Sequence, residues 1–352
     1  MTARILTGTC SWTDPTLIAC ERFYPSKSMS AKERLEFYAR HFPIVEVDST
    51  FYGTPKEETS LLWAERTPPG FVFDVKAFGL LTGHGAPLER LPPEVRGTEE
   101  PLPGKGGRPR NVYLKDLAPE QREALWEIHR QALWPLHAVG KLGAVLFQFP
   151  PWFLLSRHRK EFLRRIPERL PGFRIAVEFR GGGWMTEDAA AETLAFLEEA
   201  GLAYVSVDEP QGFPNSVPPL AAATSDLAYV RLHGRNAETW DKKGSAASDR
   251  FNYLYAEGEL REWVPKVRSL AENAKEAHVL FNNNYEDVGV RNARQMAAML
   301  DAEVGGIVSP PGGPPAAPDG VDGDGPAAPG TGGASGGAAT AADAPGQTRL
   351  DL

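Results

Sequence analysis

The chain has 352 residues, a formal net charge of −8 and only two cysteines, Cys10 and Cys20. The acidic balance gives no global basic signature for nucleic acid, and two cysteines offer neither a disulfide framework nor a cysteine-type zinc site. The first residues lack the apolar core of a signal peptide, and no apolar run approaches the ~20 residues of a membrane span. We therefore expect a cytoplasmic protein without a membrane partner.

Strand-like apolar runs alternate with helix-like segments through residues 1–305, which we expect to form a single domain. The predicted strands lie near 4–10, 43–48, 71–77, 142–149, 173–179, 203–208, 227–233 and 277–283. The predicted helices lie near 30–41, 57–66, 119–138, 158–169, 186–200, 257–275 and 287–301. This α/β alternation predicts a parallel, TIM-like (β/α)8 barrel. An open doubly wound sheet is the main alternative, although no Gly-rich dinucleotide fingerprint follows the first strand.

Three segments depart from this alternation. A Gly/Pro-rich insertion at 80–115 follows the third strand, and it is either a lid over the barrel mouth or a tolerated loop. The segment 209–226 contains four prolines, so we expect the sixth helix to be irregular or missing. Residues 309–352 are rich in Gly, Ala and Pro and poor in large apolar side chains, which predicts a disordered tail.

Polar side chains interrupt the apolar strands at their C-terminal ends, two positions apart. Glu178 and Arg180 end the fifth strand, and Arg231 and His233 end the seventh. Side chains two apart on a strand share a face, and the C-terminal ends of barrel strands meet at one mouth. The spacing therefore predicts one polar pocket at the C-terminal mouth.

Three of these strand-end residues are candidates for catalysis. A carboxylate such as Glu178 is costly in a buried strand unless it is paired or functional, so we assign it as general base or metal ligand. His233 follows Arg231 and precedes a glycine, a pattern that suits an anion cradle with His233 as general acid. Asp208 ends the sixth strand and is either catalytic or the start of a turn.

The second and third strands carry further charged candidates. Glu46 and Asp48 are carboxylates that can hold a divalent metal such as Mg or Mn, or divide acid and base roles. Alternatively, one of them caps the next turn and the other forms an ion pair inside the barrel. Lys76 either binds an anion, acts as a base, or forms a salt bridge with one of these carboxylates.

Amide and aromatic side chains after other strands are candidates for substrate binding. Gln148 ends the fourth strand and can orient a ligand by hydrogen bonds. Trp184 follows the fifth strand, where an aromatic plane beside acids suits stacking on a sugar or base. Asn282 and Asn283 end the eighth strand, where they either bind a polar ligand or form the turn that stops the strand.

Short motifs along residues 5–301 resemble the YecE-like family, which is also called domain of unknown function 72. They are Gly8–Trp12, Phe23–Pro25, Glu46–Tyr52, Trp63–Pro68, Phe73–Ala77, Thr82–His84, Phe147–Pro151, Val177–Arg180, Tyr229–Gly234 and Phe281–Asn283. The resemblance implies a TIM-like barrel but no particular reaction. It also implies that Ser11, Trp12 and His84 lie near the same pocket as the strand-end residues. The chain departs from the family pattern in its insertion, its tail and the run Gly181–Gly183.

Two classes of function fit this pattern. The first is a hydrolase or phosphodiesterase that acts on a small anionic or phosphorylated molecule bound at the barrel mouth. The second is a non-catalytic module for nucleic acid or a partner protein. It would use the aromatic side chains Trp12, Tyr52, Trp152 and Trp184 for stacking. The net negative charge counts against broad DNA binding.

Overall fold

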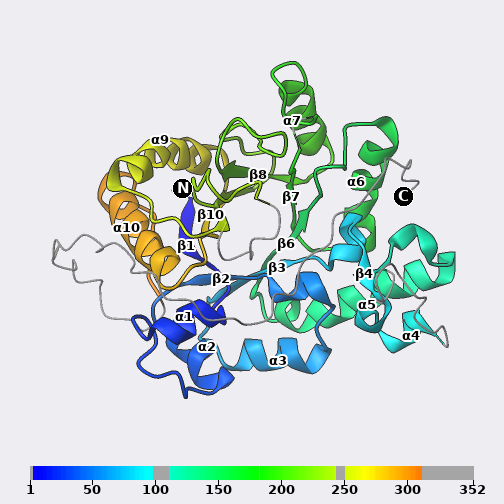
Figure 1. The fold of residues 1–352 in the computed structure, drawn as a ribbon, viewed down its shortest axis with the longest axis horizontal. Helices are drawn as coiled ribbons and strands as arrows, with labels where there is room; N and C mark the ends of the chain where they lie inside the picture. Colours follow the sequence, from blue (N-terminus) through cyan, green and yellow to red (C-terminus); the bar gives the residue numbers. More distant parts are fainter. Residues whose placement is uncertain (1–2, 98–110, 182, 243–249, 311–352) are drawn as a thin grey trace.

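The computed structural model describes residues 3–97, 111–181, 183–242 and 250–310 (Figure 1). Eight parallel strands close into a barrel in the order β1-β10-β9-β8-β7-β6-β3-β2. The strands are β1 (Arg4–Cys10), β2 (Ile44–Val47), β3 (Val72–Lys76), β6 (Leu142–Gln148), β7 (Ile175–Glu178), β8 (Ala203–Asp208), β9 (Leu227–Leu232) and β10 (Glu276–Phe281). The predicted TIM-like barrel is therefore confirmed.

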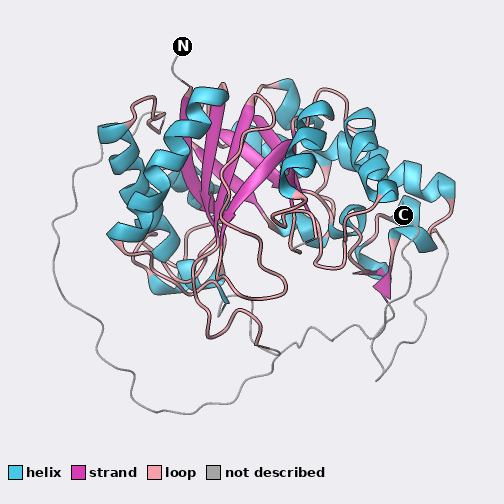
Figure 2. Cartoon of the chain, turned by 90° about the horizontal axis from the view of Figure 1, so that it is seen from above, coloured by secondary structure: helices cyan, strands magenta, loops and turns pink. Residues whose placement is uncertain are grey.

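Helices surround the barrel, and long loops gather at one end of it (Figure 2). The helices are α1 (Pro15–Cys20), α2 (Ala31–Ala39), α3 (Glu57–Glu65), α4 (Pro93–Arg96), α5 (Pro119–Ala138), α6 (Arg157–Arg169), α7 (Ala190–Glu199), α9 (Glu257–Asn273) and α10 (Val288–Glu303). The short α1 was not predicted, although Asp14 caps it and Pro15 opens it, as is common at helix starts. Within the described ranges, no helix is both long and apolar enough to cross a membrane.

No helix forms between β8 and β9, where every residue of 209–226 is described. Its prolines remove backbone donors, and side chains hold the segment against the barrel instead. Thr224 Oγ1 donates to Leu202 O (2.6 Å) and accepts from Tyr204 N (2.8 Å). The prediction of a missing sixth helix is confirmed.

The insertion after β3 contains short ordered elements on both sides of residues 98–110, which lie outside the described residues. Ala86–Pro87 (β4) pairs antiparallel with Asn111–Val112 (β5), and α4 lies between them in sequence. The idea that the whole insertion acts as a lid stays a prediction. The predicted disordered tail also falls outside the described residues, except for its first two positions.

An aromatic layer packs between the barrel and its helices. Phe73 points outward from β3 and stacks on Trp63 of α3, with ring centroids 6.1 Å apart. Phe147 points outward from β6 and stacks on Trp126 of α5 at 5.9 Å. Large buried rings of this kind contribute strongly to core stability. Because these residues face outward, the residues that alternate with them face the barrel interior.

The lower barrel interior holds a buried charge group. His278 Nδ1 lies 2.8 Å from Asp74 Oδ2, and His278 Nε2 lies 3.5 Å from Glu276 Oε2. Arg174 Nη1 then donates to the same Glu276 oxygen at 2.7 Å, nearer the surface. Burial disfavours the imidazolium, but the two carboxylates outweigh it and raise the pKa of His278. Conservation at this end of such barrels usually reflects stability rather than catalysis, and these contacts suit that role.

The raised pKa of His278 predicts a pH-dependent contribution to stability. The imidazolium stabilises the fold below the ordinary histidine pKa, and this contribution is lost as pH rises through the higher folded-state pKa. We expect the destabilisation caused by His278→Gln to be larger at pH 6 than at pH 8.5, measured by urea unfolding. An equal loss at both pH values would contradict a charged His278.

Gly143 on β6 faces this charge group with no room for a side chain. An added Cβ would lie 2.3 Å from Asp74 Oδ1 and 2.5 Å from Val72 Cγ1. We expect Gly143→Ala to lower the free energy of unfolding by about 1–3 kcal/mol through overpacking. Gly258→Ala is the matched control, because nothing lies within 4 Å of its added Cβ, and it should be near neutral.

Candidate functional site

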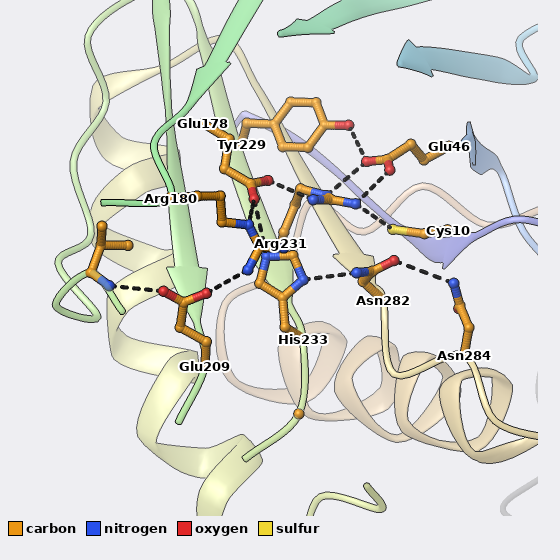
Figure 3. Close-up of polar contacts among 12 residues, drawn as sticks. Cys10, Glu46, Glu178, Arg180, Glu209, Tyr229, Arg231, His233, Asn282 and Asn284 are labelled. Carbon is orange, nitrogen blue, oxygen red and sulfur yellow. Dashed lines mark hydrogen bonds and ion pairs between the residues drawn. The ribbon is translucent and has the colours of Figure 1, made fainter. Parts of the chain in front are cut away.

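Strand register places the predicted strand-end residues inside the barrel. Glu46 on β2 lies beside Cys10 on β1, and Glu178 on β7 lies beside Gln148 on β6. Arg231 on β9 lies beside Leu280 of β10. Paired residues of neighbouring strands point to the same face, which in a closed barrel is the interior. The side chains therefore converge near the C-terminal mouth (Figure 3).

Arg231 is the centre of a buried cluster at this end of the barrel (Figure 3). Its Nε and Nη2 donate to the two oxygens of Glu46 at 2.9 and 2.7 Å. Its Nη1 donates to Glu178 Oε2 at 2.5 Å, and Nη2 lies 3.7 Å from Cys10 Sγ. The Tyr229 hydroxyl completes the Glu46 contacts at 2.9 Å. We call these five residues the Arg231 cluster, and all of them are buried.

Glu178 links the Arg231 cluster to a second arginine. Arg180 Nε forms an ion pair with Glu178 Oε1 at 2.7 Å, and Arg180 Nη1 donates to Glu209 Oε2 at 2.7 Å. His233 Nε2 lies 3.4 Å from the same Glu178 oxygen. Asn282 Nδ2 donates to His233 Nδ1 at 2.9 Å, which places the ring proton on Nε2, facing Glu178. Connected ion pairs and hydrogen bonds thus extend from the barrel interior toward the mouth.

Burial and pairing fix the protonation of the two central candidates. Burial alone would raise the pKa of Glu178, but Arg231 and Arg180 hold it well below the ordinary value. Burial, reinforced by Arg180, lowers the pKa of His233 to about 3. At neutral pH, Glu178 is a carboxylate held by two arginines and His233 is a neutral ring. Neither residue is poised to exchange protons with a substrate.

Lys76 and Asp48 lie at the mouth, outside the Arg231 cluster. Lys76 Nζ lies 4.5 Å above the Phe51 ring, and no described residue forms a hydrogen bond or ion pair with it. Burial and the charge of Arg231 lower the pKa of Lys76 to about 8. Burial raises the pKa of Asp48, whose side chain forms no cap hydrogen bond with the following turn. The two groups are close enough to shift each other's pKa.

Three further predicted residues line the rim. His84 packs edge-on against Phe51 (4.9 Å between centroids) and Trp152 (5.8 Å). Burial lowers the pKa of His84 to about 4, so its ring is neutral at physiological pH. Gln148 is half-buried at the end of β6. Ser11 follows β1 with a φ of 77°, and its N–H donates to Glu46 O at 2.8 Å.

The structure does not bring Asp208 or Asn283 into the mouth. Asp208 points out of the barrel, where Arg235 Nε donates to its carboxylate at 3.0 and 3.2 Å. Asn283 also points outward, and its Nδ2 donates to Tyr253 O at 2.8 Å. The prediction that Asp208 and Asn283 belong to the pocket is therefore corrected. Strand alternation explains the difference, because each residue is one position out of phase with the inward-facing set.

Trp12 and Trp184 are also packing residues rather than parts of the mouth. Trp12 lies edge-on against Trp63 at 5.8 Å, in the layer between barrel and helices. Trp184 stacks on Phe179 at 4.5 Å, and its Nε1 donates to Phe153 O at 2.6 Å. Each is almost fully buried, so neither ring is available to a ligand.

Sequence reasoning missed three residues that complete the network. Two of them, Cys10 and Tyr229, belong to the Arg231 cluster. Tyr229 is two positions before Arg231, the spacing that marks a shared face. Glu209 binds Arg180 and accepts a hydrogen bond from Val217 N at 2.8 Å, and burial raises its pKa to about 7. Glu209 lies in phase with the inward residues of β8, so alternation favours it over Asp208.

The carboxylates predicted to hold a metal do not form a metal site. Both oxygens of Glu46 are taken by Arg231, and one of them also accepts from Tyr229. Among the residues that the structure describes, no group of three or more His, Cys, Asp or Glu side chains could hold a metal ion. The donor set thus does not fit Mg or Mn, which prefer several free oxygens.

A surface hollow of about 270 Å³ lies away from the mouth, between α5 and α6. Its arginines are already paired, since Arg169 binds Glu123 at 2.6 Å and Arg165 binds Glu161 at 3.2 Å. We place the candidate site at the barrel mouth instead, where cationic groups lack partners.

These features define a (β/α)8-barrel protein with a preorganised polar network below its C-terminal mouth. The family model described as "Protein of unknown function DUF72" matches residues 6–318. The chain therefore belongs to the DUF72 family, as its sequence motifs predicted.

Relatives from several bacteria agree with this assignment. The UPF0759 protein YunF of Bacillus subtilis is 32% identical over 307 residues, which cover 86% of this chain and 97% of YunF. Escherichia coli YecE is 36% identical over 95 residues, 26% of this chain and 35% of YecE. A DUF72 family crystal structure from Enterococcus faecalis superposes with a TM-score of 0.68 at 26% identity, covering 84% of this chain and 95% of that one. One from Thermotoga maritima gives 0.65 at 28% identity, covering 85% and 99%.

Removal of Arg231 should be the most damaging change in the site. Arg231→Met leaves Glu46 and Glu178 buried without their main partner, and breaking a buried pair this way costs about 3–5 kcal/mol. We expect that loss in urea unfolding. Adding Glu46→Gln to the variant should recover part of it.

Arg169→Met is the matched control for this prediction. Arg169 also holds a carboxylate through two nitrogens, at 2.6 and 2.7 Å, but at the surface. Exposed pairs contribute about 0–1 kcal/mol, so the control should unfold almost like the parent protein. Equal losses in both variants would contradict a central role for Arg231.

Proposed function

We propose that this protein is an enzyme whose small anionic substrate, carboxylated or phosphorylated, binds at the C-terminal mouth of the barrel. One observation carries the proposal: two cationic side chains at the mouth keep N–H groups without partners among the described residues. Arg180 uses Nε and Nη1 for Glu178 and Glu209 and leaves Nη2 free. Lys76 has only the Phe51 ring against its ammonium group. Planar guanidinium and ammonium donors are the groups that bind carboxylates and phosphates.

The hydrolase or phosphodiesterase class predicted from sequence used Glu178 as base and His233 as acid. Their burial and pairing argue against those roles. In the proposal both residues position Arg180 instead, because Glu178 fixes its Nε and His233 supports Glu178. Acid–base work passes to Asp48, whose carboxyl group has no hydrogen-bond partner among the described residues and whose pKa burial raises.

The charge balance of the mouth couples anion binding to protonation. Burial raises the pKa of Glu209 to about 7 and also raises the pKa of Asp48, so both carboxyl groups protonate more readily than exposed ones. An anion beside Arg180 favours those protonated forms and the charged form of Lys76. Binding should therefore take up protons and weaken as pH rises through about 7–8.

The alternative function, a nucleic-acid or partner-binding module, requires exposed aromatic rings, and only two of the four predicted rings are exposed. Tyr52 and Trp152 are 64% and 45% exposed beside the mouth, whereas Trp12 and Trp184 are buried. Two exposed rings can stack on a planar group of a bound molecule. They do not make the extended run of stacking rings and basic residues that single-stranded nucleic acid needs.

We expect inorganic phosphate to bind the full-length protein at pH 6.5, measured by isothermal titration calorimetry. Arg180→Met should weaken binding about tenfold or more, because a hydrogen bond to a charged group contributes about 1.5–3 kcal/mol. Binding by the parent protein should weaken between pH 6.5 and 8.5, with proton uptake visible as a buffer-dependent heat.

Arg169→Met controls for the loss of one positive charge away from the mouth, and should bind phosphate like the parent. The proposal fails if Arg180→Met, shown by thermal unfolding to be folded, binds phosphate as tightly as the parent. Tight, salt-dependent binding of oligonucleotides without phosphate binding would instead favour the nucleic-acid alternative.

A further inference from the structure

Half-buried Lys76 differs from the buried lysine Lys141 in what its ammonium group contacts. Lys141 has the contacts expected of a lysine with a purely structural role. Its Nζ donates to Ala64 O (2.6 Å), Thr67 O (2.6 Å) and Thr67 Oγ1 (3.0 Å). Lys76 has no such set of oxygens within the described residues, although it points into the barrel mouth from the end of β3. Partial burial of a cation without protein acceptors carries a desolvation cost, so its position needs a reason other than packing.

The neighbours of Lys76 also fail to neutralise it. Glu46 and Glu178 influence its charge, but Glu46 is already paired with Arg231, and Glu178 is paired with Arg231 and Arg180. Asp48 is the remaining carboxylate that influences Lys76, and no described residue binds its side chain. The mouth therefore places an amine and a carboxyl group, both without partners among the described residues, within electrostatic range of each other, with the apolar ring of Phe51 under the amine.

We propose that Lys76 is the amine nucleophile of the mouth and forms an imine with the aldehyde or ketone group of an anionic substrate. This inference rests on the proposed function and names its substrate class, a small carbonyl compound that also carries a carboxylate or phosphate. Arg180 binds the anionic group and Lys76 reacts with the carbonyl group. Asp48 is the proton donor and acceptor.

The step balances without any further reagent. The lone pair of neutral Lys76 Nζ attacks the carbonyl carbon, and the carbonyl oxygen becomes a hydroxyl group. One proton passes from the nitrogen to that oxygen, Asp48 delivers a second proton to the resulting hydroxyl, and water leaves as the C=N bond forms. The remaining proton on the nitrogen then returns to Asp48. The products are one imine and one water molecule. A lysine in a desolvated site beside cationic groups is the usual source of such an amine.

The acidity of Lys76 supports this role. With a pKa of about 8, roughly a tenth of the Lys76 side chains are neutral at pH 7. An ordinary lysine with a pKa of about 10.4 is neutral in only a few molecules per ten thousand. Lys76 should therefore react with small aldehydes well ahead of the exposed lysines.

Reductive labelling tests the inference on the full-length protein. Formaldehyde and glyoxylate, each with cyanoborohydride at pH 7, convert imines into stable secondary amines that peptide mass spectrometry assigns to single lysines. Lys275, with an 84% exposed side chain, is the internal reference. We expect Lys76 to label at least about tenfold faster than Lys275 with formaldehyde. The ratio should be larger with glyoxylate, which carries a carboxylate for Arg180.

Matched variants separate the parts of the mechanism. Asp48→Asn should slow labelling of Lys76 while leaving Lys275 unchanged. Arg180→Met should remove the extra rate with glyoxylate but not the rate with formaldehyde. Lys76→Arg keeps the positive charge but removes the reactive amine, so the rapid mass increase of the whole protein should disappear. Phosphate should protect Lys76 from glyoxylate in the parent protein.

The outcomes distinguish this inference from the proposed function. If phosphate binds but Lys76 labels no faster than Lys275, imine formation is overturned and the anion site stands. If Lys76 labels rapidly with formaldehyde but shows no preference for glyoxylate, the anionic carbonyl class is overturned. If phosphate does not bind and does not protect Lys76, the proposed function fails, and the substrate class proposed here fails with it.

Discussion

The interaction between Arg231 and two buried glutamates underlies the rest of this site. Three of its N–H groups reach from β9 across the barrel interior to Glu46 on β2 and Glu178 on β7, at 2.5–2.9 Å. Without Arg231, two carboxylates would be buried at the top of the barrel with too few partners. With it, the barrel end is held by charge-assisted hydrogen bonds rather than by packed aliphatic side chains.

This arrangement separates structural charges from reactive ones. Glu178, Arg231 and His233 are paired, buried and fixed in one protonation state, so they orient their neighbours. Lys76 and Asp48 lie one layer nearer the mouth with shifted pKa values and no partners among the described residues. Burial lowers the pKa of Lys76 and raises that of Asp48, so it favours the neutral form of each group, and perturbed pKa values of this kind are typical of functional sites. The paired residues Glu178, Arg231 and His233 thus give Lys76 and Asp48 the rigid support that reactive groups need.

Local sequence patterns were sufficient for the architecture. Strand and helix ranges along the chain agree with the structure within a few residues, since periodicity and β-branched runs act locally. The proline-rich segment after β8 correctly predicted a missing helix, because proline blocks a helix in any tertiary context. The short α1 was missed because six residues are too few to show a helical period.

The sequence by itself determined the barrel, the family and the polar strand ends at Glu46, Glu178, Arg180, Arg231 and His233. Only the tertiary structure decided which strand-end residues face inward, because a shift of one position reverses every side chain of a strand. That is why Asp208 and Asn283 point outward while Glu209 joins the network. The tertiary structure also decided which charged side chains form ion pairs. Glu178 became a fixed carboxylate only through arginines from its own loop and another strand, and Lys76 is left without them because Glu46 and Glu178 already pair with arginines.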